Sequence, residues 1–171
     1  MTLLIVSDTH GRPDLLTEAI RRTRPDGILF AGDGLRDLTR AELPCPLWAV
    51  RGNCDWMQSP CIVGGVTLEA EDEELITLQG LRILLTHGHR YGVKGGLGTA
   101  VARAVQLDAD ALIFGHTHIP LELHLSPEET GTLSVTKPLT VFNPGSLGER
   151  PHTFGTLTLR GGQPLFGHGE L

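Results

Sequence analysis

Apolar positions in the first two thirds of the chain follow two different periods. Residues 14–23 and 96–106 carry apolar side chains at helical spacing, so each range predicts an amphipathic helix with one buried face. Around them lie short apolar runs bounded by polar or glycine residues, which are typical of buried strands. These runs cover residues 3–6, 27–30, 47–50, 66–70, 74–79, 81–85 and 111–114.

The last third of the chain has a different pattern. Four strand-like segments follow one another without helical periodicity between them: residues 119–125, 132–136, 139–142 and 154–159. An α/β first part followed by a β-rich second part predicts two sheets packed together with helices outside. The chain has 171 residues and no linker, repeat or low-complexity region, so we expect one domain over residues 1–171.

Five of the predicted strands end in side chains that bind metals, each beside a glycine. In chain order these are Asp8 and His10, Asp33, Asn53, His87, and His116 with His118. Because ligands of open α/β sheets bind outside the carboxyl ends of the strands, we expect the five loops to converge on one rim. One such motif alone is more often a turn, a helix cap or a buried histidine pair. Five together predict a shared metal site.

The chemistry of this set narrows the choice of metal. Imidazole, carboxylate and one amide suit Mn²⁺, Fe²⁺, Zn²⁺, Ni²⁺ or Co²⁺ better than calcium or an iron–sulfur cluster. Seven candidate ligands exceed the needs of one tetrahedral ion and fit two divalent ions that share a carboxylate. Two-ion sites, with ions roughly 3.5–4 Å apart, stabilise the attacking and leaving oxygens of a phosphoryl group. We expect two divalent metal ions as cofactors, with Mn²⁺ as the first choice.

The motifs resemble, in order, those of the calcineurin-like metallophosphoesterase superfamily. The family's Asp-x-His, Gly-Asp, Gly-Asn, lone His and Gly-His-x-His motifs are similar to residues 8–10, 32–33, 52–53, 87 and 115–118. The Asn-Pro-Gly-Ser motif at residues 143–146 also resembles the small single-domain prokaryotic phosphodiesterase branch. The resemblance implies an α/β fold in which two mixed β-sheets pack as a sandwich flanked by α-helices.

The resemblance further implies how the ligands are shared. One ion would be held by Asp8, His10, Asp33 and His118, and the other by Asp33, Asn53, His87 and His116. Asp33 would bridge the ions, and a hydroxide between them would attack phosphorus in line. The implied enzyme is a phosphodiesterase that acts on a small phosphoester, with Asp33, Asn53 and His87 as the catalytic residues.

One position departs from the family pattern. The usual Gly-Asn-His is Gly52-Asn53-Cys54 in this chain. In the family that histidine is assigned to protonating the leaving group or steadying the transition state, and a thiol with a pKa of about 8.5 is a poor replacement. The change predicts a preference for leaving groups that need little protonation. His89 is an alternative proton donor, although nothing in the sequence places it near the site.

Charge and composition limit the partners. The net charge is −6 and there is no run of Lys or Arg, which weighs against a nuclease for long nucleic acids but leaves a short nucleotide open. No apolar run approaches the roughly 18 residues of a membrane helix, so we expect no membrane association. Cys45, Cys54 and Cys61 form no Cys-x-x-Cys motif, and the first residues lack a basic leader segment. Both features predict a cytoplasmic protein.

Other interpretations remain at this point. The chain could be a metal-binding scaffold with the same fold, as is a subunit of the retromer coat, or a phosphomonoesterase. A homodimer through strands of the second half is also open. Three arginines are candidates for substrate binding, although a solvated surface position is favoured for each: Arg12, Arg90 and Arg150. Three histidines receive no role: His124, His152 and His168.

Overall fold

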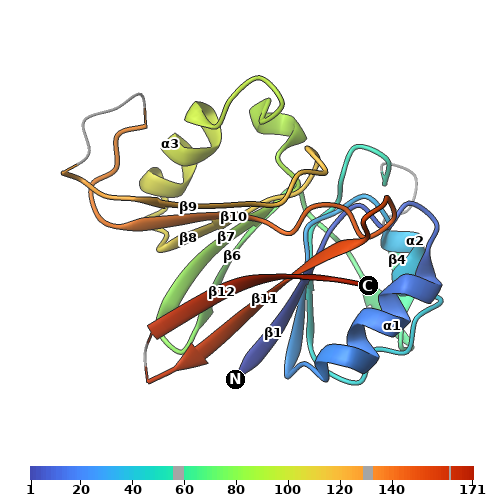
Figure 1. The fold of residues 1–171 in the computed structure, drawn as a ribbon. Coiled ribbons are helices and arrows are strands. Elements are labelled where there is room, and N and C mark those ends of the chain that lie inside the picture. Colours follow the sequence, from blue (N-terminus) through green and yellow to red (C-terminus); the bar gives the residue numbers. More distant parts are fainter. Residues whose placement is uncertain (56–59, 129–132, 162) are drawn as a thin grey trace.

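The computed structural model describes residues 1–55, 60–128, 133–161 and 163–171. Within these ranges two five-stranded sheets face each other, and a two-stranded hairpin lies beside the first (Figure 1). The first sheet contains, in spatial order, β12 (Gln163–Glu170), β11 (Thr153–Arg160), β1 (Thr2–Val6), β2 (Gly27–Phe30) and β3 (Leu47–Ala49). The second contains β6 (Glu73–Leu78), β7 (Leu81–Thr86), β8 (Ala111–Ile113), β10 (Leu139–Asn143) and β9 (Leu121–Leu125). The hairpin pairs β4 (Cys61–Val63) with β5 (Val66–Leu68).

Both large sheets are mixed, as the family resemblance implied. Strands β1, β2 and β3 run parallel, as do β7, β8 and β10, whereas β11, β12, β6 and β9 pair antiparallel with their neighbours. Parallel strands place their carboxyl ends at the same edge of a sheet. The loops after β1, β2 and β3 therefore start from one edge, and so do the loops after β7 and β8.

Side-chain alternation along β1 divides its residues between two cores. Leu3 and Ile5 face the second sheet and join the core between the sheets, whereas Leu4 and Val6 face the opposite side. All four side chains are completely buried. A strand buried on both faces reads as a continuous apolar run, which is why residues 3–6 predict a strand so clearly.

Helices cover the outer faces of the sandwich (Figure 1). Helix α1 (Pro13–Thr23) and the short α2 (Leu35–Leu38) pack on the first sheet through Leu16 and Leu35. Helix α3 (Gly98–Gln106) packs on the second sheet through Val101, and a 3₁₀ turn, η1 (His89–Tyr91), precedes it. The expected sandwich flanked by helices is confirmed. No helix in the described part of the chain has the length and apolar character to span a bilayer.

Several local predictions were wrong or incomplete. Residues 133–136 form no strand, and residue 132 lies outside the described residues. Strands β4 and β12 and helix α2 were not predicted. Helix α2 has only four residues, too few to show a period, and β12 contains two glycines and few apolar side chains. Its eight residues are held by antiparallel pairing with all of β11, a tertiary interaction that local propensity does not reveal.

Candidate metal centre

Hydrogen bonds draw the five strand-end loops together at one end of the sandwich. The backbone N–H of Asp8 donates to the carbonyl of Gly32, with a nitrogen–oxygen distance of 2.9 Å, and that of Gly115 donates to the carbonyl of His87 at 3.3 Å. Across the two sheets, His87 Nδ1 lies 2.7 Å from the carbonyl oxygen of Ala31. Loops from both sheets thus meet at one rim, as expected from the positions of the strand ends.

In the described part of the chain, three groups of side chains bring potential ligand atoms within 4.8 Å of one another. They are Asp8 with His10 and His118, Asp33 with His87 and His116, and His10 with Asp33 and Cys54. Asp33 belongs to the second and third groups, and His10 belongs to the first and third. Asp33 therefore lies near ligands predicted for both metal positions, which is what a bridging carboxylate requires. The structure brings together six of the seven predicted ligands.

Asp8 Oδ1 is the atom around which the first group gathers. It lies 3.0 Å from His118 Nε2, 3.6 Å from His10 Nε2 and 4.0 Å from His87 Nε2. None of these contacts has the geometry of a hydrogen bond, so Asp8 Oδ1 is buried without a hydrogen-bond partner among the described residues. His87 Nε2, 3.3 Å from Asp33 Oδ2, is a second buried atom of this kind.

Such unpartnered atoms test whether a metal fits. A buried carboxylate oxygen or imidazole nitrogen without a partner is costly, and a bound ion is one of the few explanations for it. Asp8 Oδ1 and His87 Nε2 are both ligand atoms of the types that divalent transition metals prefer. The residues present therefore fit a divalent cation at each of the two groups.

The remaining predicted ligand, Asn53, lies on the exposed turn after β3. Its side-chain Nδ2 donates to Cys54 Sγ at 3.3 Å, and the backbone N–H of Cys54 donates to Asp33 Oδ1 at 2.7 Å. The turn is therefore adjacent to Asp33, but no described contact joins the Asn53 amide to any of the other six ligands predicted from the sequence. Its role as a metal ligand stays a prediction.

The mutual charges of the site shift several pKa values. Burial alone would raise the pKa of Asp8, but the surrounding histidines lower it below the ordinary value. Burial also tends to raise the pKa of Asp33. The interaction with His87 lowers this pKa more strongly, so it is well below the ordinary value. Burial and the charge of His87 lower the pKa of His116 to about 4. His116 is consequently neutral near pH 7, the form that binds metal.

Five of the candidate ligands have left-handed backbone conformations. The φ angles are 55° at Asp8, 44° at His10, 60° at Asp33, 66° at His116 and 61° at His118. Residues with side chains rarely adopt such angles, and each costs on the order of 1–3 kcal/mol unless the surroundings hold it. Backbone strain of this kind concentrates at functional sites.

Glycines leave room for these conformations. A Cβ atom on Gly115 would lie 1.8 Å from Ser7 Oγ and 2.8 Å from Asp8 Oδ2, and one on Gly52 would lie 2.0 Å from Asp33 Oδ1. Each glycine is therefore required because a candidate carboxylate lies against its backbone. The glycines beside the ligands, noted in the sequence as turn residues, also prevent clashes with the ligands themselves.

Two buried carboxylates that the sequence analysis assigned no role hold the loops in place. Asp55 accepts hydrogen bonds from the backbone N–H groups of Asp33, Gly34, Leu35 and Gly52 at 2.7–3.0 Å. Asp37 accepts from Thr9 Oγ1 and from the backbone N–H of Gly11. The acidic residue two positions after Asn53 was a usable sequence signal for Asp55, whereas Asp37 had none.

The Asn-Pro-Gly-Ser motif positions two further loops. Asn143 Nδ2 donates to the carbonyl of Gly115 at 2.9 Å and to Thr117 Oγ1 at 3.0 Å, which fixes the loop that carries His116 and His118. Ser146 Oγ donates to the carbonyl of Asp8 at 3.0 Å. The motif therefore acts through the backbone of the ligand loops.

Cys54 and His89, the two residues discussed as proton donors, lie near the candidate ligands. Cys54 Sγ belongs to a ligand group with His10 and Asp33, and burial and Asp33 raise the pKa of its thiol to about 11. The His89 ring centroid lies 5.4 Å from that of His87. Of the histidines without a role, His168 Nε2 lies 2.8 Å from the carbonyl oxygen of Asn143. Its ring also stacks on Phe142.

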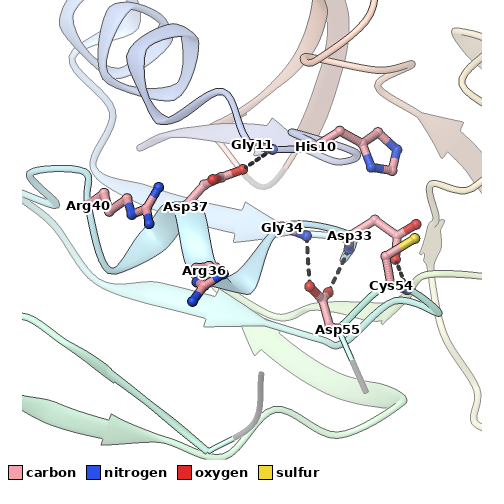
Figure 2. Close-up of a pocket in the computed structure, with 9 residues that line it drawn as sticks. All are labelled: His10, Gly11, Asp33, Gly34, Arg36, Asp37, Arg40, Cys54 and Asp55. Atoms are coloured by element: carbon pink, nitrogen blue, oxygen red, sulfur yellow. Dashed lines mark hydrogen bonds between the residues drawn. The ribbon is translucent and has the colours of Figure 1, made fainter. Parts of the chain in front are cut away.

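A pocket of about 340 Å³ opens beside these ligands (Figure 2). Its lining includes His10, Asp33 and Cys54 and also two arginines, Arg36 and Arg40. The arginines named from the sequence lie elsewhere. Arg12 pairs with Asp14, Arg90 lies 3.2 Å from Asp72, and Arg150 lines a separate pocket with His152 and Leu171.

Comparison with known proteins identifies the family of this chain. The family model of the calcineurin-like phosphoesterase superfamily domain matches residues 1–162. The probable metallophosphoesterase YsnB of Bacillus subtilis is 35% identical over 121 residues, which are 70% of this chain and 65% of that protein. Phosphodiesterase YfcE of Escherichia coli is 27% identical over 180 residues, a match that covers 92% of this chain and 87% of the relative.

The fold has solved counterparts as well. The structure of a protein described as a novel archaeal phosphodiesterase is similar over 100% of both chains, with a TM-score of 0.66 and 18% sequence identity. That likeness concerns the fold alone, whereas the family model extends over nearly the whole sequence, including every loop that carries a candidate ligand. The chain therefore belongs to the calcineurin-like phosphoesterase superfamily.

Proposed function

We propose that the protein is a metal-dependent phosphodiesterase with a dinuclear metal site. The observation that carries the proposal is the position of Asp33 between two groups of candidate ligands, next to the unpartnered atoms Asp8 Oδ1 and His87 Nε2. Two adjacent cation sites that share a carboxylate suit phosphoryl transfer, because the reaction concentrates negative charge on neighbouring oxygens. The names of the sequence relatives, a probable metallophosphoesterase and a phosphodiesterase, support this reaction class.

In this proposal Asp8, His10, Asp33 and His118 hold one ion, and Asp33, Asn53, His87 and His116 hold the other. Two divalent ions would supply a hydroxide nucleophile at neutral pH and neutralise charge on the phosphoryl oxygens. Mn²⁺ is our first choice, and Zn²⁺, Fe²⁺, Ni²⁺ and Co²⁺ suit the same ligands. Asn53 donates a hydrogen bond to a phosphoryl oxygen, and the contact of His87 Nδ1 with Ala31 fixes the ring so that Nε2 faces the site.

We infer a small phosphodiester as the substrate. With a pKa of about 11, the Cys54 thiol is a weak proton donor at neutral pH, so leaving groups that depart as stable anions are favoured. The net charge of −6 disfavours long nucleic acids. A cytoplasmic setting belongs to the same proposal, since Cys45, Cys54 and Cys61 form no disulfide bond in the described part of the chain.

A metal-by-substrate screen with Asp33→Asn tests the proposal. We expect the metal-loaded wild type to hydrolyse bis(4-nitrophenyl) phosphate faster than 4-nitrophenyl phosphate, and Asp33→Asn to lose at least 99% of that activity. Glu69→Gln removes one exposed carboxylate outside the site and serves as the control. Full activity of Asp33→Asn would contradict the two-ion proposal. Tight metal binding without turnover of any phosphoester would indicate a scaffold instead.

A further inference from the structure

We propose that Arg36 and Arg40 form a subsite for a second anionic group on the substrate. The inference rests on the proposed phosphodiesterase function and specifies its substrate class: a phosphodiester with a phosphate or similar anion on one arm, beyond the bond that is cleaved. The feature behind it is a single pocket that contains both the candidate ligands and two cationic side chains.

The pocket runs from the metal centre to helix α2. Figure 2 shows His10, Asp33 and Cys54 at one end, and Arg36 and Arg40 at the other, on α2 and just after it. Its volume of about 340 Å³ is at the lower end of the roughly 300–1,000 Å³ that is usual for small-molecule sites. A diester whose phosphorus lies at the candidate ligands can therefore extend one arm toward the arginines.

Two acidic groups that line the pocket, Asp37 and Asp55, do not neutralise Arg40. Asp55 already accepts four backbone N–H groups, and Asp37 accepts from Thr9 and Gly11. Neither carboxylate forms an ion pair with Arg40. The guanidinium of Arg40 is exposed and has no ion pair with any residue that the structure describes.

Most exposed arginines are solvated surface groups, so we compare Arg40 with the other arginines of this chain. Among the described residues, seven other arginines are paired with a nearby carboxylate: Arg12, Arg21, Arg22, Arg51, Arg82, Arg90 and Arg103. Arg40 differs because it is unpaired in the same described residues and lines the pocket of the metal centre. Guanidinium groups bind phosphate with two parallel hydrogen bonds, a geometry that lysine does not offer.

The position of α2 is also fixed relative to the metal centre. Asp55 binds the N–H of Gly34 and Leu35 at the start of the helix, and Asp37 within it binds the loop that carries His10. Both arginines are therefore attached to an element that hydrogen bonds hold to the ligand loops. A preorganised anchor of this kind adds affinity because little order is lost on binding.

Two probes that differ only in the second phosphate test the subsite. Thymidine 5′-(4-nitrophenyl phosphate) and its 3′-phosphorylated analogue both release 4-nitrophenol on cleavage of the diester. We expect the metal-loaded wild type to have a KM about tenfold lower for the analogue, the size expected for a charge-assisted pair. In Arg40→Gln and in the double variant Arg36→Gln/Arg40→Gln, the ratio of the two KM values should fall toward one.

The control is Arg160→Gln, which removes an equal charge at the far end of the first sheet. Arg160 lies beyond the Thr158 that pairs with Thr2, at the amino end of β1, whereas the metal centre is at its carboxyl end. This variant should keep the wild-type ratio. Equal KM values for the two probes in the wild type, or an unchanged ratio in the double variant, would overturn the subsite.

Calorimetry separates this inference from the proposed function. Metal-loaded protein is titrated with thymidine 3′,5′-bisphosphate and with thymidine 5′-monophosphate, and we expect about tenfold tighter binding of the bisphosphate, lost in the double variant. If no phosphodiester is hydrolysed but the bisphosphate preference is present, the proposed function fails and the subsite stands. If diesters are hydrolysed and neither binding nor KM depends on the second phosphate, the subsite is wrong.

Discussion

Asp55 Oδ2 accepts the backbone N–H of Asp33 across a distance of 2.7 Å, so a buried carboxylate after β3 holds the candidate bridging ligand after β2. The same carboxyl group binds three further backbone N–H groups, of Gly34, Leu35 and Gly52. Four donors on one carboxylate connect the two loops at a point where the paired strands β2 and β3 have already ended. The metal centre thus depends on an acid that is not itself a candidate ligand.

Replacing Asp55 with Asn should loosen this connection. The amide oxygen can still accept, but the new –NH₂ group faces backbone donors that lose their acceptor, at a cost of about 1–3 kcal/mol. For a chain of this size we expect the midpoint of thermal unfolding to fall by roughly 3–10 °C, together with weaker metal binding. Circular dichroism and metal analysis measure both effects. Glu69→Gln is the control, and a wild-type midpoint and metal content in Asp55→Asn would contradict the connecting role.

Gly52→Ala should damage the metal centre directly. The added methyl group would lie 2.0 Å from Asp33 Oδ1 and 2.6 Å from Asp33 N, so Asp33 must move. We expect loss of most metal binding and a lower unfolding midpoint. The matched control is Gly98→Ala in α3, where a Cβ atom meets nothing within 4 Å and alanine favours the helix by up to about 1 kcal/mol. Equal metal content in the two variants would show that Gly52 is not required.

Adding metal should stabilise the wild type through His116. A ligand at one hundred times its Kd stabilises the folded state by about 2.7 kcal/mol. In a chain of this size that raises the midpoint of thermal unfolding by roughly 5–10 °C. We expect this increase with Mn²⁺ or Zn²⁺, its reversal by a chelator, and the loss of most of it in His116→Gln. His124→Gln changes an exposed histidine that pairs with Glu122 and should keep the full increase. The same increase in both variants would exclude His116 as a ligand.

Cys54→His should widen the substrate range. An imidazole next to Asp33 can protonate a poor leaving group at neutral pH, whereas the thiol, with its pKa near 11, is a weak donor. We expect the ratio of 4-nitrophenyl phosphate to bis(4-nitrophenyl) phosphate hydrolysis to rise about tenfold or more. Cys54→Ser controls for the loss of sulfur and should not raise this ratio. If Cys54→His gains no monoesterase activity while its metal content is normal, the account of the missing acid is wrong.

How much of the molecule could be predicted depended on whether the signal was local. The apolar run at residues 3–6 and the amphipathic helix near residues 14–23 are local patterns, and both elements are present. The histidines and aspartates at the strand ends were recognisable because their residue types carry metal chemistry and their short spacings repeat. For Asn53 the residue type and spacing were informative, but no described contact tests it.

Elements and residues without a local sequence signal depend on tertiary structure. The hydrophobic pattern of β12 is weak, and the strand exists because β11 offers a full-length partner. Arg36 and Arg40 look like any exposed charges until the fold places them beside His10 and Asp33. Arg12 and Arg90 are next to motif residues in the sequence but pair with Asp14 and Asp72, in line with the surface position favoured for them.

A cluster of three side chains outside the metal centre should make the second sheet less stable as the pH falls into the acid range. Glu73 on β6 accepts a hydrogen bond from Arg103 Nε on α3 at 3.1 Å and another from the hydroxyl of Tyr91 on η1. Arg103 first and Tyr91 second lower the pKa of Glu73 below its ordinary value, although partial burial acts in the opposite direction. One half-buried carboxylate thereby connects a strand with two helical segments.

The sign of the pH dependence follows from this lowered pKa. A carboxylate with a folded-state pKa below its unfolded value adds stability above the unfolded pKa of about 4.5, and that contribution is lost as the pH falls through the folded value. We therefore expect Glu73→Gln to be less stable than the wild type at pH 7, with a difference that shrinks as the pH falls below 4.5. A double-mutant cycle with Arg103→Gln, followed by urea unfolding from pH 7 to 3, isolates the pair from the other carboxylates that titrate in this range. A coupling between Glu73 and Arg103 of equal size at pH 7 and pH 3 would contradict an ionised Glu73 as its source, because the protonated carboxyl group keeps its shape and loses only its charge.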